Sequence, residues 1–292
     1  MNNMLIHDVC GGNIKNVKYL LATMPLLIEC EEIAFCIACE NLNIPMAELF
    51  LSRGINIHSN NEHAFYKICT KKNTNMMKWF IDLGERYDIH IDYNSLFTTA
   101  CRAGEVGALN WLLSLKQLEG KINIKKHGNY VFQMACLKNN FNMAKCIYEK
   151  CEKSVAITDS IFYKICLFGN LDIAKWLYKK SPQKIYMHAD NDKLLRDTCL
   201  SGKIHIIEWL LSSNSFDNNA LGDVFAKTCL SLNTNNLNII KKIWNHTDIE
   251  RFVNLTELFI KSYDIGNIEI ARWIYSLNKL KFKINKEDFP GL

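Results

Sequence analysis

Apolar residues recur at helical spacing in two short segments separated by a turn. Residues one helical turn apart mark both segments: Phe162, Ile165 and Cys166 in the first, and Ile173, Trp176 and Leu177 in the second. This period places the apolar side chains on one face of a helix. Gly169 and Asn170 stand between the segments. Because glycine can end a helix in a left-handed turn, the pattern predicts two short amphipathic helices joined by a tight turn.

This predicted helix pair is one copy of a repeat. The stretch GNLDIAKWLY at 169–178 and the stretch GNIEIARWIY at 266–275 agree at six of ten positions, and the other four are conservative exchanges. The tryptophan position of the stretch recurs along the chain, 30 to 35 residues apart, at Tyr19, Leu49, Trp79, Trp111, Cys146, Trp176, Trp209, Lys242 and Trp273. The recurrence indicates nine copies.

Two further positions recur in register with the tryptophan position. Ten residues before it stand Cys39, Cys69, Cys101, Cys136, Cys166, Cys199 and, if residues 233–235 are an insertion, Cys229. Four residues earlier comes a large apolar side chain: Leu5, Phe35, Phe65, Phe97, Phe132, Phe162, Leu195, Phe225 and Phe259. A single helix pair cannot cover its own apolar face, so successive pairs must stack. The repeat therefore predicts an all-α helical solenoid.

The repeat covers essentially the whole chain. No Gly/Ser linker or low-complexity tract interrupts it, which predicts a single domain over residues 1–292. The approximate repeats are 1–29, 30–58, 59–91, 92–127, 128–157, 158–189, 190–220, 221–253 and 254–285.

The repeat resembles the ankyrin repeat. The family's leucine, paired alanines, Gly-His, paired valines and paired leucines correspond here to Phe162, Ile165-Cys166, Gly169-Asn170, Ile173-Ala174 and Trp176-Leu177. The family's Thr-Pro-Leu-His opening reads Ser160-Ile161-Phe162-Tyr163, and no copy has the Thr-Pro pair. Tetratricopeptide repeats have a Gly-Tyr and Pro signature that is missing here, and HEAT-type repeats are longer, at about 40 to 47 residues. The Trp-Leu and Cys substitutions resemble divergent ankyrin proteins of large DNA viruses and some protists.

The resemblance implies a non-catalytic protein-interaction module or scaffold that binds a partner protein on its concave surface. For a viral protein, the module would act in the host cytoplasm. Viral ankyrin proteins often carry a C-terminal box that recruits host ubiquitin ligases. The segment after the ninth repeat, 278–292, is short for such a box, so a role as ubiquitin-ligase adaptor is the weaker alternative.

In the ankyrin family, the two variable residues before the glycine often contact partners. The resemblance therefore implies a partner-binding set of Lys71, Arg102, Leu137, Leu167, Phe168, Leu200 and Leu230. If the leucines of successive repeats face outward, they form an apolar strip of the kind that marks binding sites. If the helices are rolled, the same leucines pack inward. The sequence leaves both arrangements open.

Composition narrows the alternatives. The net charge of +5 comes from 35 basic and 30 acidic residues spread along the chain, which disfavours nucleic acid as a partner. Binding of nucleic acid or an acidic partner through lysine clusters stays an alternative, at Lys121, Lys125, Lys126 and His127, at Lys179, Lys180 and Lys184, and at Lys279, Lys281, Lys283 and Lys286. No secretory leader or membrane-length apolar run is present, so we expect a cytoplasmic monomer with reduced, buried thiols.

Residue patterns for catalysis or cofactor binding are weak. Cys36 and Cys39 have the spacing of a zinc or redox pair, but no second pair follows, and Cys39 occupies the repeated core position. The eight histidines show no paired metal spacing, and no Gly-Lys-Ser/Thr phosphate loop occurs. The tryptophans could form a stacking platform, but their helical spacing favours packing between repeats. We therefore expect no enzyme activity, metal or cofactor.

Overall fold

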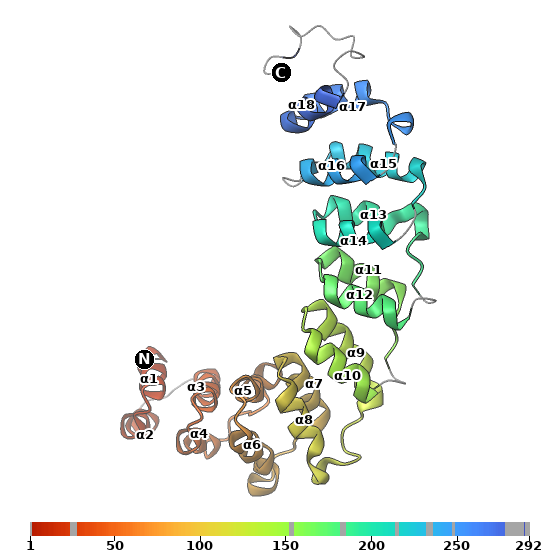
Figure 1. The fold of residues 1–292 in the computed structure, drawn as a ribbon. Coiled ribbons are helices and arrows are strands. Elements are labelled where there is room, and N and C mark those ends of the chain that lie inside the picture. Colours follow the sequence, from red (N-terminus) through yellow and green to blue (C-terminus); the bar gives the residue numbers. More distant parts are fainter. Residues whose placement is uncertain are drawn as a thin grey trace. The chain divides into compact units, whose positions relative to one another are not determined.

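The computed structural model describes residues 2–23, 28–151, 155–181, 185–213, 216–231, 236–246, 249–277 and 289. Within these residues the protein is helical, with eighteen α-helices and no strand (Figure 1). This confirms the all-α fold class that the apolar period predicts. The chain divides into two units, Met1–Ala156 and Ile157–Leu292, and each is described by itself.

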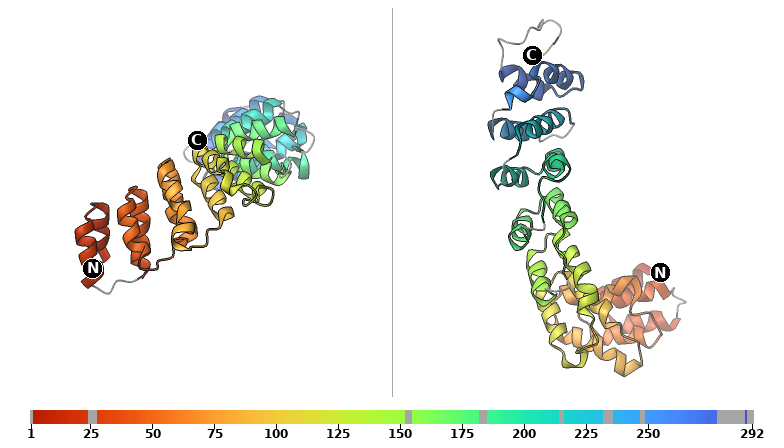
Figure 2. Two further views of the ribbon diagram at one scale, coloured as in Figure 1. Left: turned by 90° about the horizontal axis from the view of Figure 1, so that it is seen from below. Right: turned by 90° about the vertical axis from the view of Figure 1, so that its right-hand side faces the viewer.

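Unit 1 is a succession of helix pairs. Its helices are α1 (Asn2–Cys10), α2 (Ile14–Thr23), α3 (Ile28–Glu40), α4 (Ile44–Leu51), α5 (Ser59–Thr70), α6 (Thr74–Tyr87), α7 (Tyr93–Ala103), α8 (Val106–Ser114), the 3-10 helix η1 (Lys116–Leu118), α9 (Ile124–Leu137) and α10 (Phe141–Cys151). The first helix of each pair contacts the first helix of the next, in the order α1, α3, α5, α7 and α9. The pairs therefore lie side by side, as Figures 1 and 2 show.

Unit 2 repeats this organisation. Its helices are α11 (Asp159–Phe168), α12 (Leu171–Lys180), α13 (Ala189–Leu200), α14 (Ile204–Ser213), α15 (Asn218–Cys229), α16 (Asn236–His246), the 3-10 helix η3 (Glu250–Phe252), α17 (Leu255–Asp264) and α18 (Ile268–Leu277). The first helices α11, α13, α15 and α17 contact one another in order, and the second helices α14, α16 and α18 do the same. Each unit thus has one row of first helices and one row of second helices.

The repeated large apolar residue forms the core of each pair. It lies in the first helix and is exposed by 2% or less in every copy, at Leu5, Phe35, Phe65, Phe97, Phe132, Phe162, Leu195, Phe225 and Phe259. Burying a phenylalanine stabilises the folded chain by roughly 2 kcal/mol. The repeated cysteine, one helical turn later, is buried in all seven copies that carry it. These two positions form the apolar stripe on which the pairs stack.

The tryptophan position joins one pair to the next. Ring centroids lie 6.5, 6.2 and 6.2 Å apart in the pairs Phe35–Trp79, Phe162–Trp209 and Phe225–Trp273. In each case the phenylalanine belongs to the first helix of the preceding pair, so the interpretation as packing between repeats is confirmed for these three. The position is not core in every copy, because Tyr19 is 67% exposed and Lys242 is exposed.

The turn within a pair contains a residue of left-handed backbone conformation. Glycine supplies it in five copies, at Gly12, Gly104, Gly169, Gly202 and Gly266. Leu42, Lys72 and Asn139 adopt the same conformation elsewhere, with φ of 58°, 56° and 57°. A side chain in this region costs about 1 to 2 kcal/mol. The stacking of the helices therefore outweighs a local backbone penalty in those copies.

The residue after the turn is often an asparagine, which caps the second helix. Its side-chain oxygen accepts a hydrogen bond from the backbone amide three residues on, in the pairs Asn43–Met46, Asn73–Met76 and Asn140–Met143. In some copies the side-chain nitrogen also donates to the preceding pair. Asn267, for example, donates to the carbonyl of Cys229 at 3.0 Å. In Asn140, the same amide group caps the start of α10 and connects two repeats.

Candidate partner-binding surface

All the partner-binding residues that the ankyrin resemblance implies lie at the C-terminal end of a first helix or directly after it. Lys71, which follows α5, is exposed, and Arg102 in the last turn of α7 is half-buried. The remaining members close α9, α11, α13 and α15: Leu137, Leu167, Phe168, Leu200 and Leu230. We call the solvent-facing side of the first helices the first-helix face.

The leucines neither face fully outward as an apolar strip nor pack fully inward. Leu137, in unit 1, is half-buried, and so are Leu167, Leu200 and Leu230, at equivalent ends of neighbouring helices in unit 2. Each leucine contributes part of its surface to packing and keeps part exposed. Phe168, next to Leu167, is 62% exposed. At these helix ends, the exposed apolar surface therefore consists of leucine edges and one protruding phenyl ring.

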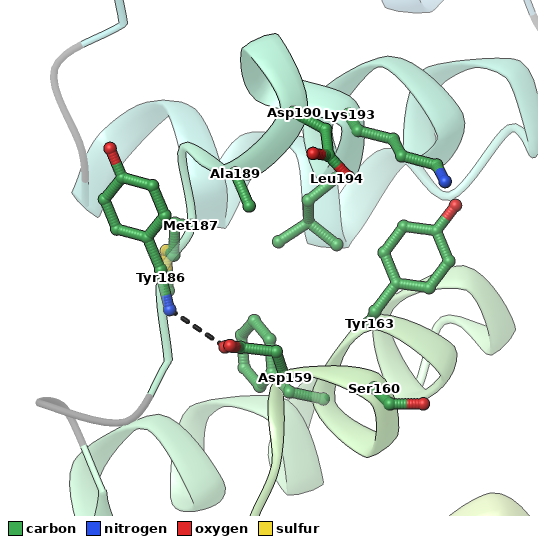
Figure 3. A pocket seen from close by; sticks show the side chains of 10 residues that line it. Asp159, Ser160, Tyr163, Tyr186, Met187, Ala189, Asp190, Lys193 and Leu194 are labelled. Carbon is green, nitrogen blue, oxygen red and sulfur yellow. Dashed lines mark hydrogen bonds between the residues drawn. The ribbon is translucent and has the colours of Figure 1, made fainter.

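A pocket lies on the first-helix face of unit 2, between α11, α13 and the segment that precedes α13. Its volume is about 200 Å³, and its lining is Asp159, Ser160, Phe162, Tyr163, Tyr186, Met187, Ala189, Asp190, Lys193 and Leu194. Figure 3 shows Tyr163 and Tyr186 on opposite sides of the cavity, with Leu194 pointing into the space between them. We call it the two-tyrosine pocket.

Hydrogen bonds fix both walls of the two-tyrosine pocket. The backbone amide of Tyr186 donates to a carboxylate oxygen of Asp159 at 2.9 Å, which holds the segment before α13 against α11 (Figure 3). The hydroxyl of Tyr163 donates to the carboxylate of Asp197 on α13. Burial, together with this hydrogen bond, raises the pKa of Tyr163 to about 12. The Tyr163 side chain therefore stays neutral and anchored.

The rim of the two-tyrosine pocket is polar and its interior is apolar. The Lys193 ammonium lies 5.6 Å from the centre of the Tyr163 ring, and Asp190 is exposed at the edge. Tyr186 is 67% exposed, although Met187 beside it is buried. An apolar side chain of another molecule could enter between the tyrosine rings while its main chain meets the charged rim.

A second pocket lies on the first-helix face of unit 1. It has a volume of about 290 Å³ and is lined by Asn61, Ser95, Thr98, Thr99, Cys101, Arg102, Tyr130, Val131 and Met134. The Arg102 guanidinium lies 5.4 Å from the centre of the Tyr66 ring and donates to the backbone carbonyl of Asn61. Tyr130 is 60% exposed. We call this cavity the Arg102 pocket.

Comparison with models of known protein families finds no match to this chain, and neither does comparison with curated proteins. The interpretation of both pockets therefore depends on their own geometry and chemistry.

The lysine clusters are only partly within the described residues. Lys121, Lys125 and Lys126 are exposed around the start of α9, and the Lys121 ammonium lies 5.3 Å from the centre of the Tyr93 ring. Lys179 and Lys180 are exposed at the end of α12 in unit 2. Lys184, the insertion at 233–235 and the segment 278–288, with the lysines Lys279, Lys281, Lys283 and Lys286, lie outside the described residues.

The cysteine pair with metal-like spacing is part of the core. Cys36 and Cys39 are both buried in α3, and burial raises the pKa of Cys36 to about 11. Across the described residues, no three His, Cys, Asp or Glu side chains gather as they would around a metal ion. In the same part of the chain, no helix combines the length and apolar character that crossing a bilayer requires.

The tyrosines that line the two pockets, and Tyr66 beside Arg102, are residues that sequence reasoning missed. Tyr66 and Tyr163 each follow the repeated phenylalanine, and Tyr130 stands two residues before it. Other copies have different residues at these positions, so a search for recurring residues passes over them. The signal that could have found them is an aromatic residue that few other copies share and that stands at a position that the helical period predicts to be solvent-facing.

Proposed function

We propose that the chain is a non-catalytic protein-interaction module built of ankyrin-type repeats, which binds a partner protein on its first-helix face. The observation that carries the proposal is the two-tyrosine pocket with the exposed Phe168 on the same helix as Tyr163. Exposed aromatic side chains beside a preformed apolar cavity are typical energetic centres of protein interfaces. The serial helix pairs, with their period of 30 to 35 residues, support the ankyrin-type assignment.

The size of the two-tyrosine pocket favours a protein partner over a small-molecule substrate. Ligand sites usually enclose about 300 to 1,000 Å³, whereas this cavity has about 200 Å³, enough for one or two side chains. The Tyr163 side chain and the Tyr186 backbone are already held by Asp197 and Asp159, so less ordering is needed on binding. A preformed side-chain socket of this kind suits a protein that presents an apolar residue.

A peptide selection tests this proposal. A random peptide library displayed on phage is selected against the intact chain, and the affinities of enriched peptides are measured for the wild type and for the double variant Phe168→Ala, Tyr186→Ala. We expect enrichment, and binding weakened by tenfold or more in the variant, because these rings supply the apolar contact. The melting temperature should change little, since both side chains are mostly exposed.

The matched control is Tyr19→Ala, which removes an equally exposed tyrosine from the second helix α2. This variant should bind the selected peptides as tightly as the wild type. Failure to enrich any peptide would reject the proposal, and so would an equal loss of affinity in the Tyr19 variant. Binding of single-stranded oligo-uridine that falls steeply with salt would favour the nucleic-acid alternative instead.

A further inference from the structure

The Arg102 pocket is lined by hydrogen-bonding groups without a carboxylate. Its polar members supply an amide, hydroxyls and one guanidinium: Asn61, Ser95, Thr98, Thr99, Tyr130 and Arg102. The Thr98 hydroxyl donates its proton to the backbone carbonyl of Ser95 at 2.9 Å, so an anion in the cavity depends on the other donors, chiefly the Arg102 guanidinium. Arg102 is the one charged residue of the lining, so the cavity favours a negatively charged group.

Arg102 differs in its pairing from three neighbouring cations, Lys67, Lys71 and Lys72. Lys67 and Lys71 share the carboxylate of Glu40, at 3.0 and 3.8 Å. Lys72 pairs with Glu105 at 3.0 Å. Within the described residues, Arg102 has no carboxylate at ion-pair distance, and its hydrogen bond to Asn61 uses one of five guanidinium N–H groups. The guanidinium that lines the cavity therefore has further N–H groups with which to bind a ligand.

The position of Arg102 is fixed before any ligand arrives. The ring of Tyr66 lies under the guanidinium, and the imidazole of His63 stacks on that ring with a centroid distance of 6.1 Å. Arg102 itself is half-buried, so an ion pair formed there is screened less by water than one at an open surface. The planar fork of a guanidinium matches the two oxygens of a carboxylate.

We infer that the Arg102 pocket binds the carboxylate of an aspartate or glutamate side chain in the partner protein. The carboxylate pairs with the free edge of the Arg102 guanidinium, and the exposed Tyr130 ring packs on the peptide beside it. A cavity of about 290 Å³ accepts an acidic side chain with part of its main chain. This inference rests on the proposed function and gives it a chemical specificity.

The same charges argue against nucleic acid in this pocket. A phosphate backbone is held by several cations that follow its path. Lys67, Lys71 and Lys72 are already paired with Glu40 and Glu105, and the exposed Lys125 and Lys126 of α9 do not line the cavity. A single unpaired cation in a polar cavity instead fits one isolated carboxylate.

The test uses the intact chain in three forms: wild type, Arg102→Gln and Lys72→Gln. The control variant removes one positive charge from the turn after α5, outside the pocket. Each form is used to select a random displayed peptide library. We expect wild type and Lys72→Gln to enrich peptides with an acidic residue at a fixed distance from an apolar one. Arg102→Gln should enrich peptides without the acidic preference.

A second measurement changes the peptide and leaves the protein intact, so a folding defect of Arg102→Gln cannot imitate the result. The best wild-type peptide is compared with its Glu→Gln or Asp→Asn counterpart, which should bind about tenfold more weakly to the wild type and equally to Arg102→Gln. Selected peptides without acidic preference would overturn the inference and leave the proposed function standing. No selected peptide at all would reject both, and Arg102-dependent binding of oligo-uridine would replace the carboxylate with a phosphate.

Discussion

The side-chain amide of Asn140 forms hydrogen bonds with two repeats at once. Its Nδ2 donates to the carbonyl oxygen of Gly104 at 2.9 Å, and its Oδ1 accepts from the amide of Met143 at 3.0 Å. The first bond joins the turn after α7 to the turn before α10, and the second caps α10. A Cβ atom on Gly104 would lie 2.5 Å from that nitrogen, so the contact leaves no room for a side chain.

Two substitutions at Asn140 separate the cap from the link between repeats. Asn140→Asp keeps an oxygen that can cap α10 but removes the donor to Gly104, and should lower the free energy of unfolding by about 1 kcal/mol. Asn140→Ala removes both bonds and should lower it by about 2 kcal/mol. Urea denaturation measures both values. Equal losses would mean that the cap on α10 contributes nothing, and an unchanged stability of Asn140→Asp would mean the same of the bond to Gly104.

Leu42→Gly should stabilise the protein. Leu42 has φ of 58° in the turn between α3 and α4, where glycine carries no steric penalty, and its side chain is 37% exposed. Relief of the strain outweighs the greater freedom of glycine in the unfolded chain, so we expect a gain of about 0.5 to 1 kcal/mol in urea denaturation. The converse control is Gly266→Ala, at φ of 85° with open space around the added Cβ, which should destabilise by about 1 kcal/mol. A loss of stability in Leu42→Gly would show that its apolar contacts matter more than its backbone conformation.

His58 should make stability depend on pH. Its imidazole Nδ1 lies 2.8 Å from the buried Glu62 carboxylate, and this hydrogen bond raises the pKa of His58 against the opposing effect of partial burial. Interaction with the His90 carbonyl and with Asp92 acts in the same direction. Because the folded-state pKa exceeds that of the unfolded chain, the stabilisation is complete below the unfolded value, about 6.5, and is lost as pH rises through the folded value.

The difference in unfolding free energy between wild type and His58→Gln measures this contribution. It should be larger near pH 5.5 than near pH 8, because the imidazole loses its proton as the pH rises through the unfolded-state and then the folded-state pKa. A difference that stays constant between these pH values would show that His58 carries no linked proton.

Cysteine labelling should report the repeated core position. Burial raises the pKa of Cys69 and of Cys136 to about 12, so only about one thiol in ten thousand is ionised at pH 8. Cys10, in α1, is exposed. Labelling with dithiobis-nitrobenzoate, followed by mass spectrometry of the peptides, should modify Cys10 first. Cys69 and Cys136 should react only as the chain unfolds, and labelling of either at the rate of Cys10 would contradict their burial.

The sequence predicts the helical scaffold because the scaffold is periodic. Phe162 and Cys166 mark the buried stripe of α11, and Gly169 marks the turn after it. The large apolar residue recurs in all nine copies, the cysteine in seven and the glycine in five. Burial of one face is a requirement that every copy shares, so the buried positions recur more regularly than the turn. The helix pairs and their cores follow from that pattern alone.

The candidate site could be predicted only in part, because its residues belong to single copies. Arg102 was found through its position before the glycine, but its contact with Tyr66 joins two helices 36 residues apart in sequence. Half-burial of the leucines depends on how far each helix is rolled, and an apolar period does not fix that angle to within one residue. Tyr186 and Asp159 lie 27 residues apart in sequence and share no pattern, so only the three-dimensional structure shows that they line one pocket.

The link between Asn140 and Gly104 has a consequence for how such a chain could acquire new partners. The bonds of Asn140 belong to the turns, whereas Tyr130 and Phe168 are exposed on the first helices α9 and α11. Exchange of these exposed residues would leave the bonds of the turns untouched. Under the proposed function, the residues that select a partner are separate from those bonds, so specificity could diverge quickly on an unchanged frame.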